Sequence, residues 1–143
     1  MKSLYNVFSA AVSMFLFSCN DDAVYFDERD AYVGDYKVDD YCDTGISDYE
    51  LTVLKSDYDH DEIYFSFPGL FEAGLEVHAI VTGMKVVVPL QQFYISSYPE
   101  IFYEFSGSGS LNDSIFTIDY QVLTVENGLI MDDIDCQAVL KRF

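Results

Sequence analysis

The sequence IFYEFSGSGSLNDSIFTIDYQV at residues 101–122 decides the fold. Apolar side chains recur at every second position on both sides of the central Asn112-Asp113 pair, a pattern typical of two β-strands joined by a tight turn. Helical periodicity is scarce. We therefore predict a β-hairpin that turns at residues 112–113. Gly107 and Gly109 fall on its inward face, where they let the strand bend sharply or another backbone segment approach closely.

The same period of two continues from residue 31 to the end of the chain. Asn127-Gly128 is a strong signal for another hairpin turn, and Pro89 indicates a strand end or an edge. There is no room for a long crossover helix. We predict an all-β fold, a single antiparallel meander of about eight strands closing into a small β-barrel, with a two-layer β-sandwich as the alternative. The six further strands are expected near residues 32–39, 49–53, 63–67, 75–81, 84–90 and 134–140.

Two cysteines help to choose between these architectures. Cys42 ends the first predicted strand and Cys136 begins the last, and each shares the parity of its strand's apolar face. In a closed barrel with an even number of strands, the first and last strands are antiparallel neighbours, so the two positions lie close together. The apolar run near the N-terminus, at residues 4–17, indicates export, and an exported chain meets an oxidising compartment. We therefore predict a disulfide that closes a loop of about 95 residues. Two buried free thiols are the alternative.

The first residues predict export. Lys2 precedes an apolar run at residues 4–17, and Ser18 stands before Cys19. These are the parts of a secretory signal, and the run is shorter than the roughly 20 apolar residues that span a bilayer. We therefore predict a cleaved signal peptide at this end of the chain rather than a membrane-spanning helix.

Leu16-Phe17-Ser18-Cys19 resembles a bacterial lipobox, although Phe17 is bulkier than usual at its position. The resemblance implies cleavage before Cys19 and lipid on its thiol and freed amine. An ordinary secretory signal with a coincidental cysteine is the alternative. Asn20-Asp21-Asp22 resembles the acidic tag that some Gram-negative bacteria use to carry lipoproteins to the cell exterior.

These resemblances divide the chain and give it a location. We expect a signal peptide at 1–18, a lipidated cysteine with an acidic tether at 19–28 and a barrel-like domain at 29–143. The expected location is the outer membrane, facing the exterior, with a periplasm-facing location as the alternative.

The charge balance limits the partners. Removal of the 18-residue signal leaves 125 residues and loses only the charge of Lys2, so six basic and 25 acidic side chains give a net charge of −19. Such a surface repels nucleic acid and anionic headgroups. We expect no nucleic-acid partner and membrane contact through the anchor only.

Two resemblances bear on the fold. Gly34-Asp35-Tyr36 together with Arg142 resembles the lipocalin signature, in which a basic residue from the barrel's end packs across a first-strand aromatic ring. This implies a lipocalin-like barrel, although the chain contains no Trp. The segments at 88–91, 105–110 and 115–120 resemble a pattern in small lipoproteins of surface-exporting Gram-negative bacteria, which implies a surface location.

Seven inward aromatic residues are the candidates for lining a ligand cavity in the barrel, although aromatic residues this numerous more often fill a core. They are Tyr32, Tyr36, Phe65, Tyr103, Phe105, Phe116 and Tyr120.

Two surface sites are weaker candidates. Asp57, Asp59 and Asp61 place oxygen ligands at alternate positions, as a calcium loop does, but the sequence fails the EF-hand pattern further on, so we favour a solvated hairpin. Asp113-Ser114-Ile115 resembles a short O-glycosylation site of surface-exporting bacteria, which makes Ser114 a candidate acceptor.

No catalytic constellation stands out. Ser108 lies between glycines but lacks the spacing of a nucleophile elbow, and only His60 and His78 could serve as bases. We expect no enzyme activity and no cofactor. The expected function is a non-enzymatic, lipid-anchored surface lipoprotein that binds a protein, a glycan or a small apolar ligand. A structural accessory subunit of a surface assembly is the alternative, and a hydrolase is less favoured.

Overall fold

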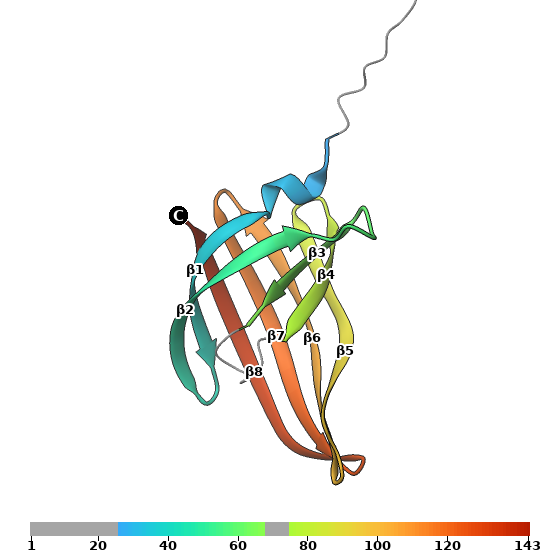
Figure 1. The fold of residues 1–143 in the computed structure, drawn as a ribbon. Coiled ribbons are helices and arrows are strands. Elements are labelled where there is room, and N and C mark those ends of the chain that lie inside the picture. The colour runs from blue at the N-terminus through green and yellow to red at the C-terminus, as the bar shows by residue number, and fades with distance from the viewer. Residues whose placement is uncertain (1–25, 68–74) are drawn as a thin grey trace, which may run out of the picture.

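The computed structural model describes residues 26–67 and 75–143. Each strand pairs antiparallel with the next along the chain, and β8 pairs with β1, which closes the barrel (Figure 1). The predicted all-β meander and barrel are confirmed, and the sandwich is excluded by the β1–β8 pairing. The elements are η1 (Glu28–Ala31), β1 (Gly34–Cys42), β2 (Gly45–Lys55), β3 (Glu62–Ser66), β4 (Glu76–Thr82), β5 (Lys85–Ser97), β6 (Glu100–Asn112), β7 (Ile115–Glu126) and β8 (Leu129–Arg142).

The two ends of the barrel differ. Helix η1, the β4–β5 turn and the C-terminus lie at one end, which we call the proximal end because the described chain enters there (Figure 1). The β5–β6 and β7–β8 hairpins lie at the opposite end, the distal end, and extend well past β3 and β4. The strand pairings that close the barrel all lie between Gly34 and Arg142.

The interaction that the lipocalin signature implies is present at the proximal end. Arg142 lies over the Tyr36 ring at 5.4 Å, and its Nη2 donates to the Tyr36 hydroxyl at 3.0 Å. The same nitrogen donates to the carbonyls of Ala31 at 2.7 Å and Val33 at 3.0 Å. The guanidinium therefore joins the last strand to the segment that leads into the first, a geometry that suits its planar, always charged head. This arrangement is consistent with a lipocalin-like architecture.

Pro89 does not end its strand, contrary to one of the two interpretations of the sequence. It lies inside β5, where the register with β6 shifts between Val88 and Gln91. A bulge leaves one residue out of the hydrogen-bonded ladder, so the missing N–H of proline costs no strand hydrogen bond there.

The glycines of the 101–122 hairpin act through close packing. Gly107 pairs with Tyr120 across β6 and β7. A Cβ at position 107 would lie 2.5 Å from the Asp119 carbonyl oxygen and 2.9 Å from the Tyr120 Cβ. A Cβ at position 109 would lie equally close, at 2.5 Å from the Thr117 carbonyl oxygen. The absence of side chains lets these two strands curve tightly against each other.

We expect Gly107→Ala to lower the free energy of unfolding by about 1–3 kcal/mol, because the added methyl group overlaps backbone atoms that cannot rotate away. Denaturant unfolding of the variant and the parent measures this difference. The matched control is Ser108→Ala on the exposed face of the same strand, which should change stability by less than about 0.5 kcal/mol. Equal midpoints for Gly107→Ala and the parent would contradict the packing argument.

Candidate functional site

The seven predicted cavity residues form part of a packed core. Ring centroids lie 5.1 Å apart for Tyr32 and Phe116, and 4.9 Å apart for Phe105 and Tyr120. Phe67, which the sequence analysis placed on a strand but not in the cavity, joins this group by contacting Phe65, Phe105 and Tyr120 at 5.0–5.4 Å. Five of the seven side chains have at most 1 % of their surface exposed, whereas Tyr103 is only partly buried. Close ring packing of this kind fills space, so these residues serve as core.

A buried carboxylate group sits inside the barrel near its first hairpin, and the sequence analysis missed it. Asp40 is 1 % exposed, and its Oδ2 accepts hydrogen bonds from the hydroxyls of Tyr49 at 2.7 Å and Tyr120 at 2.6 Å. Strand parity could have found it, because Asp40 has the same parity as the inward Tyr36 and Val38 on β1. The two phenols supply the hydrogen bonds that make a buried carboxylate tolerable.

The predicted disulfide lies beside this carboxylate. Cys42 and Cys136 are directly paired across β1 and β8, and their sulfurs are bonded. The disulfide is thus confirmed, and its position follows from the antiparallel contact of the first and last strands. Asp40, Cys42 and Cys136 place possible ligand atoms within 4.8 Å of one another, but the two thiols are consumed in the disulfide and cannot act as thiolate ligands.

The buried tyrosines should make the barrel sensitive to alkali. Burial, followed by the hydrogen bond to Asp40, raises the pKa of Tyr49 and of Tyr120 far above the ordinary value of 10.0. Burial also raises the pKa of Tyr32 to about 12. Because the folded state keeps these protons while the unfolded chain loses them above pH 10, the stabilisation is complete below pH 10 and decreases as the pH rises above it.

We expect the free energy of unfolding to fall above pH 10 by up to about 1.4 kcal/mol per pH unit for each of these tyrosines. Urea unfolding at successive pH values, with phenolate absorbance followed in parallel, measures the slope. Tyr120→Phe should reduce the slope, whereas phenylalanine at the exposed Tyr58 should leave it unchanged. A stability that is independent of pH between 9 and 11.5 would contradict the expectation.

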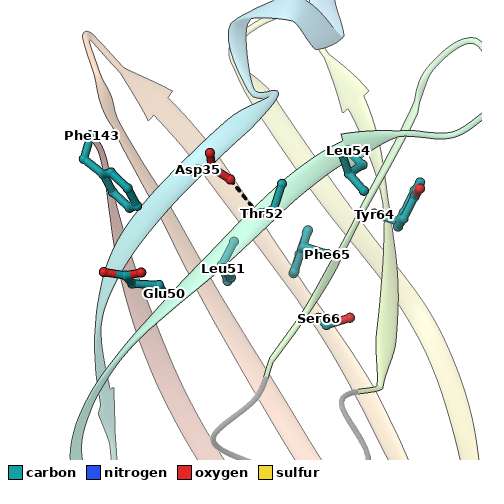
Figure 2. Close-up of a pocket in the computed structure, with 9 residues that line it drawn as sticks. All are labelled: Asp35, Glu50, Leu51, Thr52, Leu54, Tyr64, Phe65, Ser66 and Phe143. Carbon is teal, nitrogen blue, oxygen red and sulfur yellow. Dashed lines mark hydrogen bonds between the residues drawn. The ribbon is translucent and has the colours of Figure 1, made fainter.

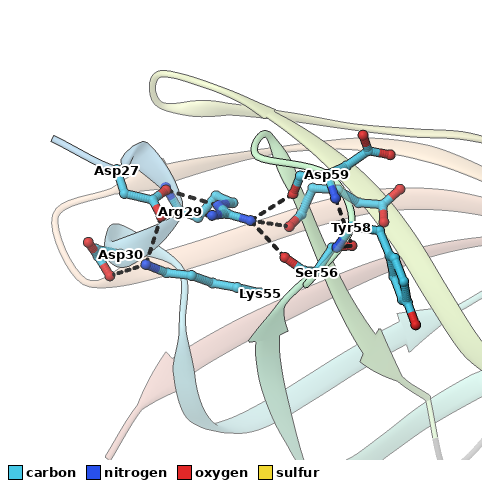
Figure 3. A network of polar contacts seen from close by, with 8 residues as sticks. Asp27, Arg29, Asp30, Lys55, Ser56, Tyr58 and Asp59 are labelled. Carbon is cyan, nitrogen blue, oxygen red and sulfur yellow. Dashed lines mark hydrogen bonds and ion pairs between the residues drawn. The ribbon is translucent and has the colours of Figure 1, made fainter. Parts of the chain in front are cut away.

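At the proximal end, a buried arginine joins η1 to the β2–β3 loop (Figure 3). Arg29 is 7 % exposed, and its Nη1 donates to the carbonyls of Ser56 at 3.0 Å, Asp59 at 2.8 Å and Glu62 at 3.4 Å. Its Nη2 and Nε both donate to the Asp27 carboxylate at 2.9 Å. The β2–β3 loop therefore wraps its backbone oxygens around a cationic side chain.

The three acidic residues of the calcium hypothesis lie in this same loop. Within residues 26–67 and 75–143, the carboxylates of Asp57, Asp59 and Asp61 do not form a group close enough to hold one ion. All three residues are exposed. The oxygens of this loop that do converge are backbone carbonyls, and the cation among them is Arg29.

The same network shows where the tether meets the barrel. Asp27 caps η1, and its carboxylate also contacts Lys55 at 2.8 Å. Glu28 accepts a hydrogen bond from the Gly83 N–H at 2.6 Å. Residues 27 and 28, which the sequence analysis assigned to the tether, thus contact the barrel and fix the point at which the chain enters it.

A surface pocket of about 590 Å³ opens between β2 and β3 (Figure 2). These strands pair only at Leu54↔Tyr64 and Lys55↔Ile63. On its polar side, the Thr52 hydroxyl donates to the Asp35 carboxylate at 2.6 Å. These two polar groups already bind each other rather than converging on the open space, so we assign this pocket no ligand.

Large apolar side chains are exposed at the distal end of the β5–β8 sheet. Tyr94 on β5, Phe102 on β6, Val125 on β7 and Ile130 on β8 are successive cross-strand partners. We call these four residues the apolar row. Because Phe102 has the opposite parity to the core residue Phe105, the row lies on the outer face of the sheet. Tyr94 and Ile130 are 67 % and 65 % exposed, and Tyr98 in the adjacent turn is 95 % exposed.

The remaining predicted sites lie apart from one another. Ser114 is exposed in the β6–β7 turn, as its candidate role requires. His78 contacts Glu62 at 2.9 Å through Nδ1 and Glu76 at 3.1 Å through Nε2. Both ring nitrogens are therefore engaged by carboxylates and not by a serine. Cys19 and the signal at 1–18 lie outside the described residues.

No helix in the described parts of the chain is long and apolar enough to cross a membrane. Comparisons with protein-family models, with curated proteins and with solved structures found no match to this chain.

Proposed function

We propose that this protein is a non-catalytic, lipid-anchored binding module of the bacterial outer membrane that faces the cell exterior. The observation that carries the proposal is that the two ends of the barrel differ. The described chain enters at the proximal end, and the β5–β6 and β7–β8 hairpins lie at the opposite end (Figure 1). The apolar row, with its exposed Tyr94 and Ile130, lies in these hairpins. An anchor on Cys19 would lie seven residues before Phe26, a reach of at most about 25 Å. The proximal end would then lie near the membrane, and the distal hairpins would point away from it.

The packed interior of the barrel favours a binding site on its outer surface. The aromatic side chains that would line an internal ligand site are packed against one another. Contiguous exposed apolar surface on a folded domain marks a site of interaction with another molecule. The outer face at the distal end is therefore the surface that we assign to partner binding.

The anchor is tested by expressing the full chain, with a labelled fatty acid, in a Gram-negative host that exports lipoproteins to its surface. We expect the parent to incorporate label and to fractionate with the outer membrane. Cys19→Ser should lose the label, and the control Cys42→Ser/Cys136→Ser should retain it, because only Cys19 belongs to the lipobox-like segment. Label in Cys19→Ser, or none in the parent, would refute lipidation at this residue.

Protease treatment of intact cells tests the orientation. The parent should be cut, and Asp21→Ala/Asp22→Ala should be labelled equally but protected if the acidic tag directs export to the exterior. Protection of both proteins would place the module on the periplasmic side and refute its display on the cell surface.

A further inference from the structure

The apolar row is a continuous surface built by four strands. The rings of Tyr94 and Phe102 contact each other at 5.5 Å between centroids, and Val125 beside Phe102 is buried although it does not belong to the core of the barrel. The row therefore has a buried centre and two exposed ends, Tyr94 and Ile130. An apolar centre of low exposure with exposed apolar neighbours is the arrangement found at the centre of many protein interfaces.

The neighbouring row on the same face is acidic. Gln92, Glu104, Leu123 and Asp133 are successive cross-strand partners. The Gln92 side chain donates to Glu104 at 2.8 Å, and each carboxylate keeps further lone pairs for a partner. The outer face thus presents an apolar strip beside two fixed carboxylates.

Basic and acidic side chains are also unevenly distributed along the chain. No Lys or Arg occurs between residues 86 and 140. The distal parts of β5–β8 and their turns therefore carry acidic side chains without basic ones. The acidic residues there are Glu100, Glu104, Glu126, Asp132, Asp133 and Asp135. The basic residues of the described chain are Arg29, Lys37, Lys55, Lys85, Lys141 and Arg142.

We infer that the apolar row and its acidic neighbours dock a protein surface that has an apolar centre and a rim of Lys or Arg. A basic rim would neutralise the negative charge of the distal carboxylates. Opposite potentials across an interface favour the correct partner and speed association. A second copy of this chain would bring acidic faces together, and an anionic membrane would repel them. This inference deepens the proposed function. It rests on that function for the direction in which the row faces, away from the membrane, but the binding chemistry does not depend on it.

The test uses the chain from residue 20 onward, which contains every strand of the closed barrel. The probe is an amphipathic helical peptide of Lys and Leu, labelled for fluorescence anisotropy, at physiological ionic strength. Peptides of Glu and Leu and of Lys and Ser are the charge and apolarity controls. We expect measurable binding of the Lys/Leu peptide and at least about tenfold weaker binding of each control.

Matched variants locate the binding site. Tyr94→Ser/Ile130→Ser should weaken binding about tenfold or more, because it removes the exposed ends of the row. Tyr58→Ser/Ile115→Ser removes the same residue types at exposed positions away from the row and should bind as the parent does. Glu104→Gln/Asp133→Asn should weaken binding and flatten its salt dependence, whereas Asp35→Asn/Glu50→Gln should do neither. Thermal unfolding of each variant confirms that it is folded.

The outcomes are distinct. Unchanged binding in Tyr94→Ser/Ile130→Ser, or equal binding of the Glu/Leu peptide, overturns the inference. Self-association of the parent that this variant abolishes would assign the row to a second copy, and row-dependent binding to phosphatidylcholine vesicles would assign it to a membrane. Each of these results also overturns it. None depends on Cys19, so failure of the anchor experiment and failure of this one can be told apart.

Discussion

Replacing Arg29 by glutamine is expected to lower the free energy of unfolding by about 3–5 kcal/mol. The guanidinium is buried, and its Nη1 reaches the carbonyls of Ser56 and Asp59 at 3.0 and 2.8 Å. The shorter, uncharged side chain cannot supply the donors in this geometry, so the loop carbonyls lose this donor, and the hydrogen bond to Ser56 is a buried one. Denaturant unfolding measures the loss. The control is Lys85→Gln, which removes an exposed cation from the same end and should change stability little.

The Arg29 variant also has a signature in acid. The hydrogen bonds from Arg29, followed by the one from Lys55, hold the pKa of Asp27 well below its ordinary value of 3.8. A lowered folded-state pKa contributes stability that is present above pH 3.8 and is lost as the pH falls below it. The parent should therefore lose stability between pH 4 and 2 more steeply than Arg29→Gln does. Parallel pH profiles, or a midpoint for Arg29→Gln equal to that of the parent, would refute the assigned role of this network.

Loss of the disulfide is expected to cost about 4–5 kcal/mol. Cys42 and Cys136 are 94 residues apart in sequence, so the bond restricts nearly the whole domain in its unfolded state. A chain freed of this constraint gains entropy on unfolding, and the reduced protein should melt at a markedly lower temperature. Thermal unfolding with and without a thiol reductant measures the effect.

The double variant Cys42→Ala/Cys136→Ala separates the bond from other effects of the reductant. It should unfold at the lower midpoint under both conditions, because no bond remains to be reduced. The Asp40 carboxylate lies 3.8 Å from the Cys42 sulfur, so any effect of the two substitutions on Asp40 is included in the midpoint of this variant. Identical midpoints of the oxidised and the reduced parent would show that strand pairing alone stabilises the closure of the barrel.

Some of this architecture is readable from single strands. Alternation of apolar and polar residues is a local property, because successive side chains of a strand point to opposite faces. It placed Cys42, Cys136, Gly107 and Gly109 on inward faces. Asp40 has the same parity, but an acidic residue does not contribute to an apolar pattern, so the pattern does not predict its burial.

Other features depend on contacts between segments that are distant in the sequence. The apolar row exists because three pairings and their bulges bring Tyr94, Phe102, Val125 and Ile130 into register. A bulge shifts which residues are neighbours, and no single strand reveals it. Arg29 has no periodic signal at all, because its partners are backbone carbonyls of a loop about 30 residues away.

By itself, the sequence determined the all-β class. Strand parity and an even strand number favoured a closed barrel over a sandwich and a Cys42–Cys136 bond over two free thiols, and the β1–β8 pairing decided both. It also carries the lipobox-like segment on which the proposed anchor rests. Only the tertiary structure decided that the aromatic interior is packed, that Arg29 occupies the loop suggested for calcium, and that acidic and apolar side chains share the distal outer face. These features depend on register and on through-space contacts, which the alternation within one strand does not encode.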